Sequence, residues 1–236
     1  MFDAVVLGAT FTAAGFLSAF EGNCAVIEKN TLCGYEFINA LKKGVEFKET
    51  PKTKNGVNFY EMLEKRDVFE SDFNLFDAVV PLYRTFENKS IMLGTRVCEI
   101  EKKEDVFEIT VFNNSGFEKI YTKKIIDTRC KKEDVISKTL NAIVKTELSL
   151  EESGISERKI YKCPLEIDDD FIVAREKLKK ELEKGMIADY IAPEFDVVTR
   201  ENILEKGEII YIPSVSYKNP HLAFDAGCRL AEEGLR

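Results

Sequence analysis

The stretch "VVLGATFTAAGF" (5–16) decides the fold of this chain. An apolar run ends at a single glycine and continues into small residues and threonines, a pattern typical of a buried strand that turns into a helix. "CAVIE" (24–28) follows as a second apolar strand ending in an acid, so the start of the chain predicts a βαβ unit. Two interpretations stay open on these residues alone: a nucleotide-binding turn that keeps one of its usual three glycines, or a buried strand–helix corner.

The spacing after Gly8 bears on the first interpretation. A dinucleotide-binding turn, G-x-G-x-x-G, uses glycine for a tight turn, for close approach to a pyrophosphate and for close helix packing. Here the three positions are Gly8, Thr10 and Ala13, so only the first glycine is kept. We expect Ala13 to allow close packing, whereas the Thr10 side chain either crowds a pyrophosphate or donates a hydrogen bond to it. Glu28 lies twenty residues after Gly8, where an acid accepts from a ribose hydroxyl.

Length and charge limit the classes of function. The 236 residues are 44% hydrophobic, enough for one large domain or one domain with a smaller inserted lobe. A formal net charge of −8 argues against a nucleic-acid partner, which needs a basic face. The six cysteines form no C-x-x-C pair, and no secretory signal or membrane-spanning run is visible. We therefore expect reduced thiols in a cytoplasmic protein that binds neither a membrane nor a metal.

The rest of the chain alternates helical and strand patterns. Helical spacing occurs in 57–65 and 74–88, where Pro81 is expected to kink or restart the helix. Residues 94–128 predict a three-stranded antiparallel meander with a turn at "NNSG" (113–116). A strand over 158–167, a helix over 170–185, a strand over 208–215 and a helix over 219–234 complete the pattern.

The order of five segments resembles the FAD-dependent oxidoreductases of the glutathione-reductase-like fold. These segments are "VVLGATFTAAG", "VIEKN", "GTRVCEIEKKEDVFEITV", "KKIIDT" and "YKNPHLAFDAG". The resemblance implies an α/β fold: a FAD/NAD(P)-binding Rossmann-like domain, with a parallel sheet plus a three-stranded antiparallel meander, built from residues 1–129 and 207–236. Residues 131–206 would form a small inserted α+β lobe in the position of a substrate domain.

The same resemblance implies a set of cofactor-binding residues. A pyrophosphate would lie at Gly8, Ala9, Thr10, Phe11, Thr12 and Ala13, the adenosine ribose at Glu28 and Lys29, and the adenine at Val97. Thr128, in "IIDTR" (125–129), stands where the family has an alanine-threonine-glycine ending, with Arg129 in place of the glycine. The helix start at Asn219, Pro220 and His221 would direct its N–H groups at a flavin, where the helix dipole stabilises negative charge.

Other interpretations of single residues stay open. His221, the only histidine, also fits a capping or surface position. Cys33 is expected to be structural or incidental, because flavin disulfide reductases carry C-x-x-x-x-C near this point and no second cysteine stands there. Tyr190 and Tyr217 are candidates for lining a substrate pocket, and no catalytic residue is identified.

Three functions fit these residues. The first is a FAD-binding oxidoreductase that transfers a hydride between a small-molecule substrate and flavin. The second is a non-catalytic protein of the same fold that holds FAD, NAD or another ADP-containing ligand, or that has lost the ligand. The third is a relative that consumes a bound nucleotide, as thiazole-forming enzymes do, although no metal cluster supports it. The sequence leaves open a homodimer and does not reveal the substrate.

Overall fold

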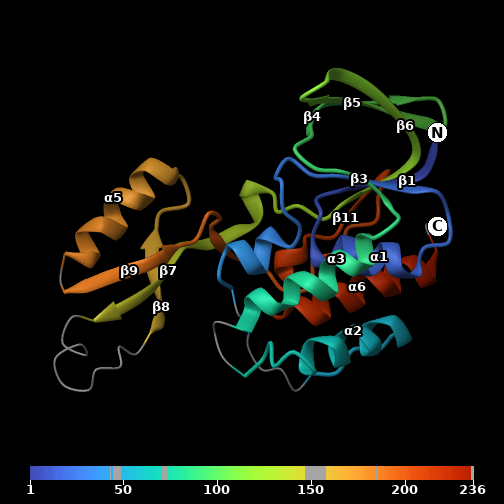
Figure 1. The fold of residues 1–236 in the computed structure, drawn as a ribbon. Coiled ribbons are helices and arrows are strands. Elements are labelled where there is room, and N and C mark those ends of the chain that lie inside the picture. Colours follow the sequence, from blue (N-terminus) through green and yellow to red (C-terminus); the bar gives the residue numbers. More distant parts are fainter. Residues whose placement is uncertain (43, 45–48, 71–73, 147–157, 184, 235–236) are drawn as a thin grey trace.

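The computed structural model describes residues 1–42, 44, 49–70, 74–146, 158–183 and 185–234. Within these residues the larger sheet has seven strands, in the order β3-β2-β1-β6-β5-β4 with β11 also paired to β6 (Figure 1). The strands are β1 (Phe2–Leu7), β2 (Cys24–Ile27), β3 (Ser90–Met92), β4 (Arg96–Lys103), β5 (Val106–Asn113), β6 (Gly116–Asp127) and β11 (Ile209–Tyr211).

The long strand β6 belongs to two parts of this sheet. Its first half pairs antiparallel with β5, and its second half pairs parallel with β1 on one side and β11 on the other. The expected parallel sheet and three-stranded meander are both confirmed, with 113–116 as the turn between β5 and β6. Because Leu7 and Asp127 are register partners, the carboxyl ends of β1 and β6 lie side by side.

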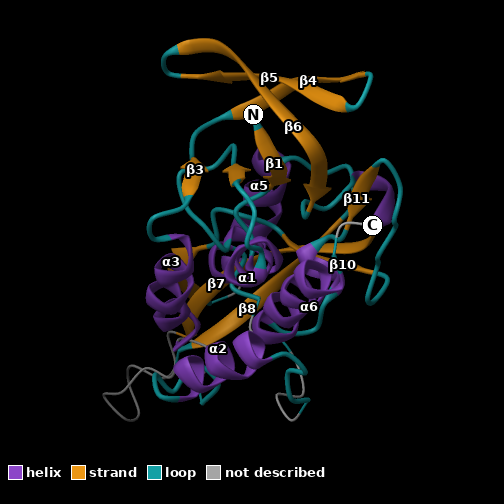
Figure 2. Cartoon of the chain, turned by 90° about the vertical axis from the view of Figure 1, so that its right-hand side faces the viewer, coloured by secondary structure: helices purple, strands orange, loops and turns teal. Residues whose placement is uncertain are grey.

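Strand β1 is apolar and buried from Ala4 to Leu7 because both of its faces are covered there. Val6 belongs to the core on the helix side of the sheet, whereas Val5 and Leu7 pack with Ile109 and Val111 of the meander. Figure 2 shows the meander on one side of the parallel strands and the helices on the other. This double burial accounts for the uninterrupted hydrophobic run, which polar residues would break in a strand with one solvated face.

Helices cover this side of the sheet, with two of them, α1 (Phe11–Ala19) and α6 (Pro220–Glu233), in close contact. The others are α2 (Lys54–Glu64) and α3 (Val79–Phe86). A Cβ on Gly15 would lie 1.8 Å from the carbonyl oxygen of Phe224, and one on Gly227 would lie 2.0 Å from that of Thr12. Close helix packing therefore depends on Gly15 and Gly227, in addition to the buried Ala13 expected for this role.

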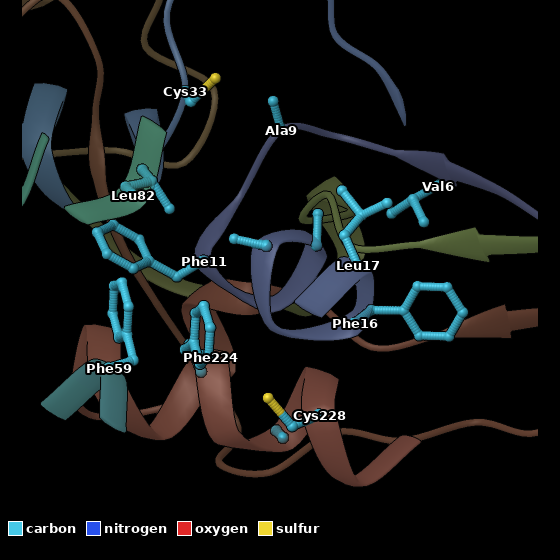
Figure 3. Close-up of a cluster of buried hydrophobic side chains, with 14 of the residues drawn as sticks. Val6, Ala9, Phe11, Phe16, Leu17, Cys33, Phe59, Leu82, Phe224 and Cys228 are labelled. Atoms are coloured by element: carbon cyan, nitrogen blue, oxygen red, sulfur yellow. The ribbon is translucent and has the colours of Figure 1, made fainter. Parts of the chain in front are cut away.

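Aromatic rings fill the space between α1, α2 and α6 (Figure 3). The rings of Phe59 and Phe224 stack with centroids 4.0 Å apart, and Phe11 meets Phe59 edge-on at 6.0 Å. All three side chains are almost fully buried. The small residues of "TFTAAG" thus bring the helices together, and the phenylalanines fill the core around them.

A second, antiparallel sheet lies to the left of the first in Figure 1. It contains β7 (Val135–Thr146), β8 (Lys159–Leu165), β9 (Met186–Ile191) and β10 (Asp196–Thr199). Helix α5 (Phe171–Leu182) covers this sheet through Ala174 and Leu178. These elements fall within 131–206, while the division of the chain into domains stays a prediction.

Several expected elements differ in length from those observed. Helix α1 ends at Ala19, and the chain then turns to place Cys24 opposite Ala4 in the sheet. The strand expected over 208–215 ends at Tyr211, since Pro213 cannot donate to a sheet, and a short 3₁₀ turn follows at Ser214–Ser216. Pro81 lies in the first turn of α3, after a 3₁₀ turn (Asn74–Ala78), so the expected restart is confirmed.

Candidate functional site

The turn from β1 into α1 keeps the conformation that its glycine permits. Gly8 has φ +96°, a region that side chains disfavour. A Cβ there would lie 2.9 Å from both the Arg129 Cγ and the Thr128 Oγ1. The first glycine therefore serves the tight turn, and the Arg129 side chain packs over it.

The N-terminal amides of α1 are bonded to side chains from distant segments. The Phe11 N–H donates to the Glu36 Oε1 at 2.8 Å, and the Thr12 N–H to the Ser214 Oγ at 3.3 Å. The Ser214 hydroxyl donates in turn to the same Glu36 oxygen at 2.8 Å. A helix N-terminus carries unpaired donors and partial positive charge. A carboxylate of this chain thus holds the place where such a helix binds an anion.

Glu36 lies on a single π-helical turn (Tyr35–Asn39) that begins after Gly34, a residue with φ +69°. Its side chain is buried, and that burial raises the pKa of the carboxyl to about 7 against the opposing effect of its hydrogen-bond donors. Sequence analysis missed Glu36 and Ser214. Neither spacing nor periodicity marks them, because a π-helical turn has no sequence signature of its own.

Thr10 is the N-cap residue of α1. Its Oγ1 accepts from the Ala13 N–H at 3.1 Å and donates to the Thr128 Oγ1 at 2.8 Å. The Thr128 hydroxyl in turn donates to the Leu7 carbonyl oxygen, also at 2.8 Å. The Thr10 side chain is therefore turned toward the end of β6 and is buried there.

Glu28 is held in the same turn by the backbone. Its Oε2 accepts from the Ala9 N–H at 2.9 Å and its Oε1 from the Asn30 N–H at 2.7 Å. Burial raises the pKa of this carboxyl, and these two bonds oppose the rise. The carboxylate thus stands at the end of β2, beside the first amides of the turn.

A cavity of about 380 Å³ opens at the carboxyl ends of these strands. It is lined by Lys29, Tyr35, Glu36, Asp127, Thr128, Arg129, Cys130, Lys131, Glu194, Phe195, Val197 and Val215. It lies between the main sheet and the start of β10 in the second sheet. Ligands of open α/β sheets bind at the carboxyl ends of strands, where neighbouring strands diverge. The Arg129 guanidinium is committed to Asp127, with both contacts at 2.8 Å.

The start of α6 is covered by other parts of the chain. The His221 Nε2 lies 3.0 Å from the Glu49 carbonyl oxygen, and its ring meets those of Tyr60 and Phe69 edge-on. A Cβ on Gly44 would lie 2.2 Å from the Asn219 Oδ1, so the backbone passes directly over this helix start.

No protein-family model and no curated protein sequence matches the chain. Among solved structures, it is similar to p-nitrophenol 4-monooxygenase from Pseudomonas putida, with a TM-score of 0.55 and 14% identity over 98% of this chain and 77% of that one. A geranylgeranyl bacteriochlorophyll reductase-like protein from Thermoplasma acidophilum gives 0.58 and 10%, with the same shares covered.

Aklavinone-11 hydroxylase, solved as a ternary complex with FAD and aklavinone, gives a TM-score of 0.54 at 12% identity. The match covers 98% of this chain but only 62% of the hydroxylase. The chain has the FAD/NAD(P)-binding Rossmann-like fold. At these identities the likeness establishes the fold alone, and the sheet order and crossover at α1 agree with it.

Within this fold, the residues proposed for a pyrophosphate and adenosine come together. Gly8 to Ala13, Glu28 and Thr128 meet at one turn. Val97 is the second residue of β4. Two residues before it, the Thr95 N–H donates to the backbone carbonyl of Glu28 at 2.8 Å. Lys29 lines the cavity. Their cofactor roles stay predictions.

The proposed flavin end is placed differently. Asn219, Pro220 and His221 are buried and are absent from the described lining of the cavity. A surface position for His221 is wrong, because its ring is fully enclosed, and burial lowers the pKa of the imidazole.

Other candidate side chains also have defined places. Cys33 is buried, and burial raises its pKa to about 12, which leaves an unreactive thiol and agrees with a structural role. All six cysteines are free. Tyr217 lines a second cavity of about 280 Å³ with Lys42 and Asp196, and Tyr190 lines a different hollow on the second sheet. Among the described residues, no helix is both long and apolar enough to cross a membrane.

Proposed function

We propose that this protein binds FAD at the α1 turn and acts as an oxidoreductase on a small-molecule substrate, transferring a hydride between substrate and flavin. The observation that carries the proposal is the N-terminus of α1 beside the cavity at the carboxyl ends of β1 and β6. Its Phe11 and Thr12 amides already hold oxygen acceptors. A dinucleotide places its pyrophosphate at this point of the fold.

The donor set fits such a group. The Phe11 and Thr12 amides would hold pyrophosphate oxygens in place of Glu36 and Ser214. Glu28 would accept from ribose hydroxyls, and Lys29 would supply positive charge at the cavity. Bound flavin supplies the hydride chemistry. The chain contributes binding, orientation and, through the second sheet at the cavity, exclusion of water.

A second candidate function is a ligand-binding protein of the same fold without redox turnover. Two observations favour it. The Arg129 side chain covers Gly8, where close approach to a pyrophosphate is expected. The backbone at Gly44 and Glu49 covers the α6 start, where a flavin is expected.

Absorption spectroscopy separates the two. Purified protein is incubated with FAD, freed of excess by gel filtration, and then treated anaerobically with NADH or NADPH and with candidate small-molecule donors. A yellow protein whose flavin bands bleach supports the oxidoreductase. Retained flavin that no donor reduces supports the binding protein, and a colourless protein rejects FAD binding.

The role of Glu28 is tested by Glu28→Gln, with the exposed Glu118→Gln as the matched control. We expect the first variant alone to weaken FAD binding, by about tenfold or more, because a charge-assisted hydrogen bond is lost. Equal affinities would reject the ribose assignment. A cytoplasmic location, a homodimer, the absence of a nucleic-acid partner and the domain boundaries stay predictions.

A further inference from the structure

We propose that the Glu36 carboxylate is an internal competitor for the pyrophosphate of a dinucleotide at the N-terminus of α1, and that dinucleotide binding displaces it and takes up one proton. The inference rests on the proposed dinucleotide site and adds a residue that controls its affinity. Glu36 bonds to the Phe11 amide on one side and lines the cavity on the other. A ligand entering from the cavity therefore meets Glu36 before it reaches the amides.

The two oxygens of this carboxylate are in unequal positions. Oε1 accepts from the Phe11 amide and the Ser214 hydroxyl, both at 2.8 Å. Oε2 is buried without a hydrogen-bond partner among the described residues. A buried, unsatisfied carboxylate oxygen is costly. The side chain thus bonds to the helix like an anionic ligand but less completely than a pyrophosphate, whose several oxygens could reach both amides.

Charge explains why displacement would involve a proton. Moving Glu36 into the cavity while a pyrophosphate takes its place would set two anions side by side, which raises the free energy unless the carboxyl is neutral. Arg129 offers little relief, because its guanidinium is paired with Asp127. Burial already places the pKa of Glu36 near 7, so protonation is accessible near neutral pH.

Several other ionisable groups surround Glu36. They are Glu28 at the end of β2, Lys29, Cys33 and Tyr35 beyond it, Asp127, Arg129, Cys130 and Lys131 at the end of β6, and Glu194 before β10. Burial raises the pKa of Cys33 to about 12 and that of Cys130 to about 11, and it raises that of Tyr35 well above its usual value. These three groups stay neutral between pH 6 and pH 8. Like-charge repulsion from Glu28 also raises the pKa of Glu36, which favours a neutral Glu36 when an anion binds.

The test compares the wild type with Glu36→Gln, which keeps an oxygen acceptor for Phe11 and removes the charge. Glu118→Gln is the matched control. The ligands are FAD and ADP-ribose, whose pyrophosphate diesters do not titrate near neutral pH. The dissociation constant is measured by calorimetry from pH 6 to pH 8, in two buffers of different ionisation enthalpy that count the protons taken up.

For the wild type and Glu118→Gln, we expect proton uptake to rise from near zero at pH 6 to close to one proton at pH 8, and the dissociation constant to rise about fivefold from pH 7 to pH 8. Glu36→Gln should bind about tenfold more tightly at pH 8, with little dependence on pH. If it fails to fold, Ser214→Ala replaces it: this variant removes one donor to Glu36 and should tighten binding while keeping the pH dependence.

The outcomes separate this inference from the proposed function. FAD binding with the same affinity and pH profile in the wild type and Glu36→Gln overturns the inference and leaves the flavoprotein proposal standing. Binding of ADP-ribose alone, with the expected dependence on Glu36, supports the inference and rejects FAD as the ligand. No binding of either ligand by either protein overturns both.

Discussion

The N-termini of α1 and α6 are both contacted by other parts of the chain, but by different kinds of group. At α1 the cover is a pair of side chains, Glu36 and Ser214, with a cavity behind them. At α6 it is backbone, from Gly44 and the Glu49 carbonyl. A side chain leaves by rotating about its own bonds, whereas a backbone cover leaves only if a loop moves. If a ligand binds as proposed, it reaches the α1 amides by side-chain rotation alone, whereas the start of α6 would open only through a backbone movement.

This comparison assumes that α1 and α6 are packed rigidly against each other. The substitution Gly227→Ala tests the assumption and has the largest expected effect. The new Cβ would lie 2.0 Å from the Thr12 carbonyl oxygen and 2.6 Å from the Phe16 nitrogen. Backbone atoms cannot move aside cheaply, so we expect a loss of about 3 kcal/mol in the free energy of unfolding, measured by urea denaturation.

Gly207→Ala is the control for this substitution. Gly207 is exposed, and the nearest atom to an added Cβ is 3.6 Å away. Its effect should stay within about 0.5 kcal/mol. Similar effects from the two variants would show that α1 and α6 adjust to each other, and the contrast between their starts would then lose its basis.

The ionisable groups at the two helix starts, Glu36 and His221, make stability depend on pH in opposite directions. Burial raises the folded-state pKa of Glu36 to about 7, so stability is fully present below its unfolded value near 4.5 and is lost as the pH rises toward 7. Burial lowers the folded-state pKa of His221, so stability is present above its unfolded value near 6.5 and is lost as the pH falls below it.

Urea denaturation from pH 5 to pH 8 separates these contributions. As the pH rises from 5 to 7, the free energy of unfolding of Glu36→Gln should increase by on the order of 2 kcal/mol relative to that of the wild type. His221→Phe, which keeps an aromatic ring beside Tyr60 and Phe69, should lose less stability than the wild type as the pH falls below 6.5. Parallel profiles for all three proteins would mean that neither group is buried in the charge state assigned to it.

Much of the fold was predictable, because short-range sequence patterns determine many of its elements. The apolar run ending at Gly8, the alternation in 94–128 and the helix opened by Pro220 each follow from short-range rules. The order of these elements then pointed to the FAD/NAD(P)-binding fold. Gly15 and Gly227 were less accessible, since their role appears only when two helices 200 residues apart in sequence meet.

The site was predictable only where the chain is continuous. Gly8, Thr10 and Glu28 could be placed by counting from one strand to the next. The Glu36–Ser214 pair could not, because its members are separated by 178 residues and meet only in the folded chain. The burial of His221 was missed for a similar reason: the aromatic rings around it come from a separate segment, with Tyr60 on α2.

The smallest expected effect concerns Thr10, which stands where a dinucleotide-binding turn has glycine. Thr10→Ala removes the N-cap of α1 and the bond to Thr128, so it should cost about 1 kcal/mol in the free energy of unfolding. Thr10→Ser keeps the hydroxyl and removes only the methyl group, so its stability should be close to that of the wild type. If that methyl crowds a pyrophosphate, Thr10→Ser binds ADP-ribose more tightly than the wild type. Unchanged affinity would show that the Thr10 side chain, turned toward Thr128, already leaves room for a pyrophosphate at the α1 amides.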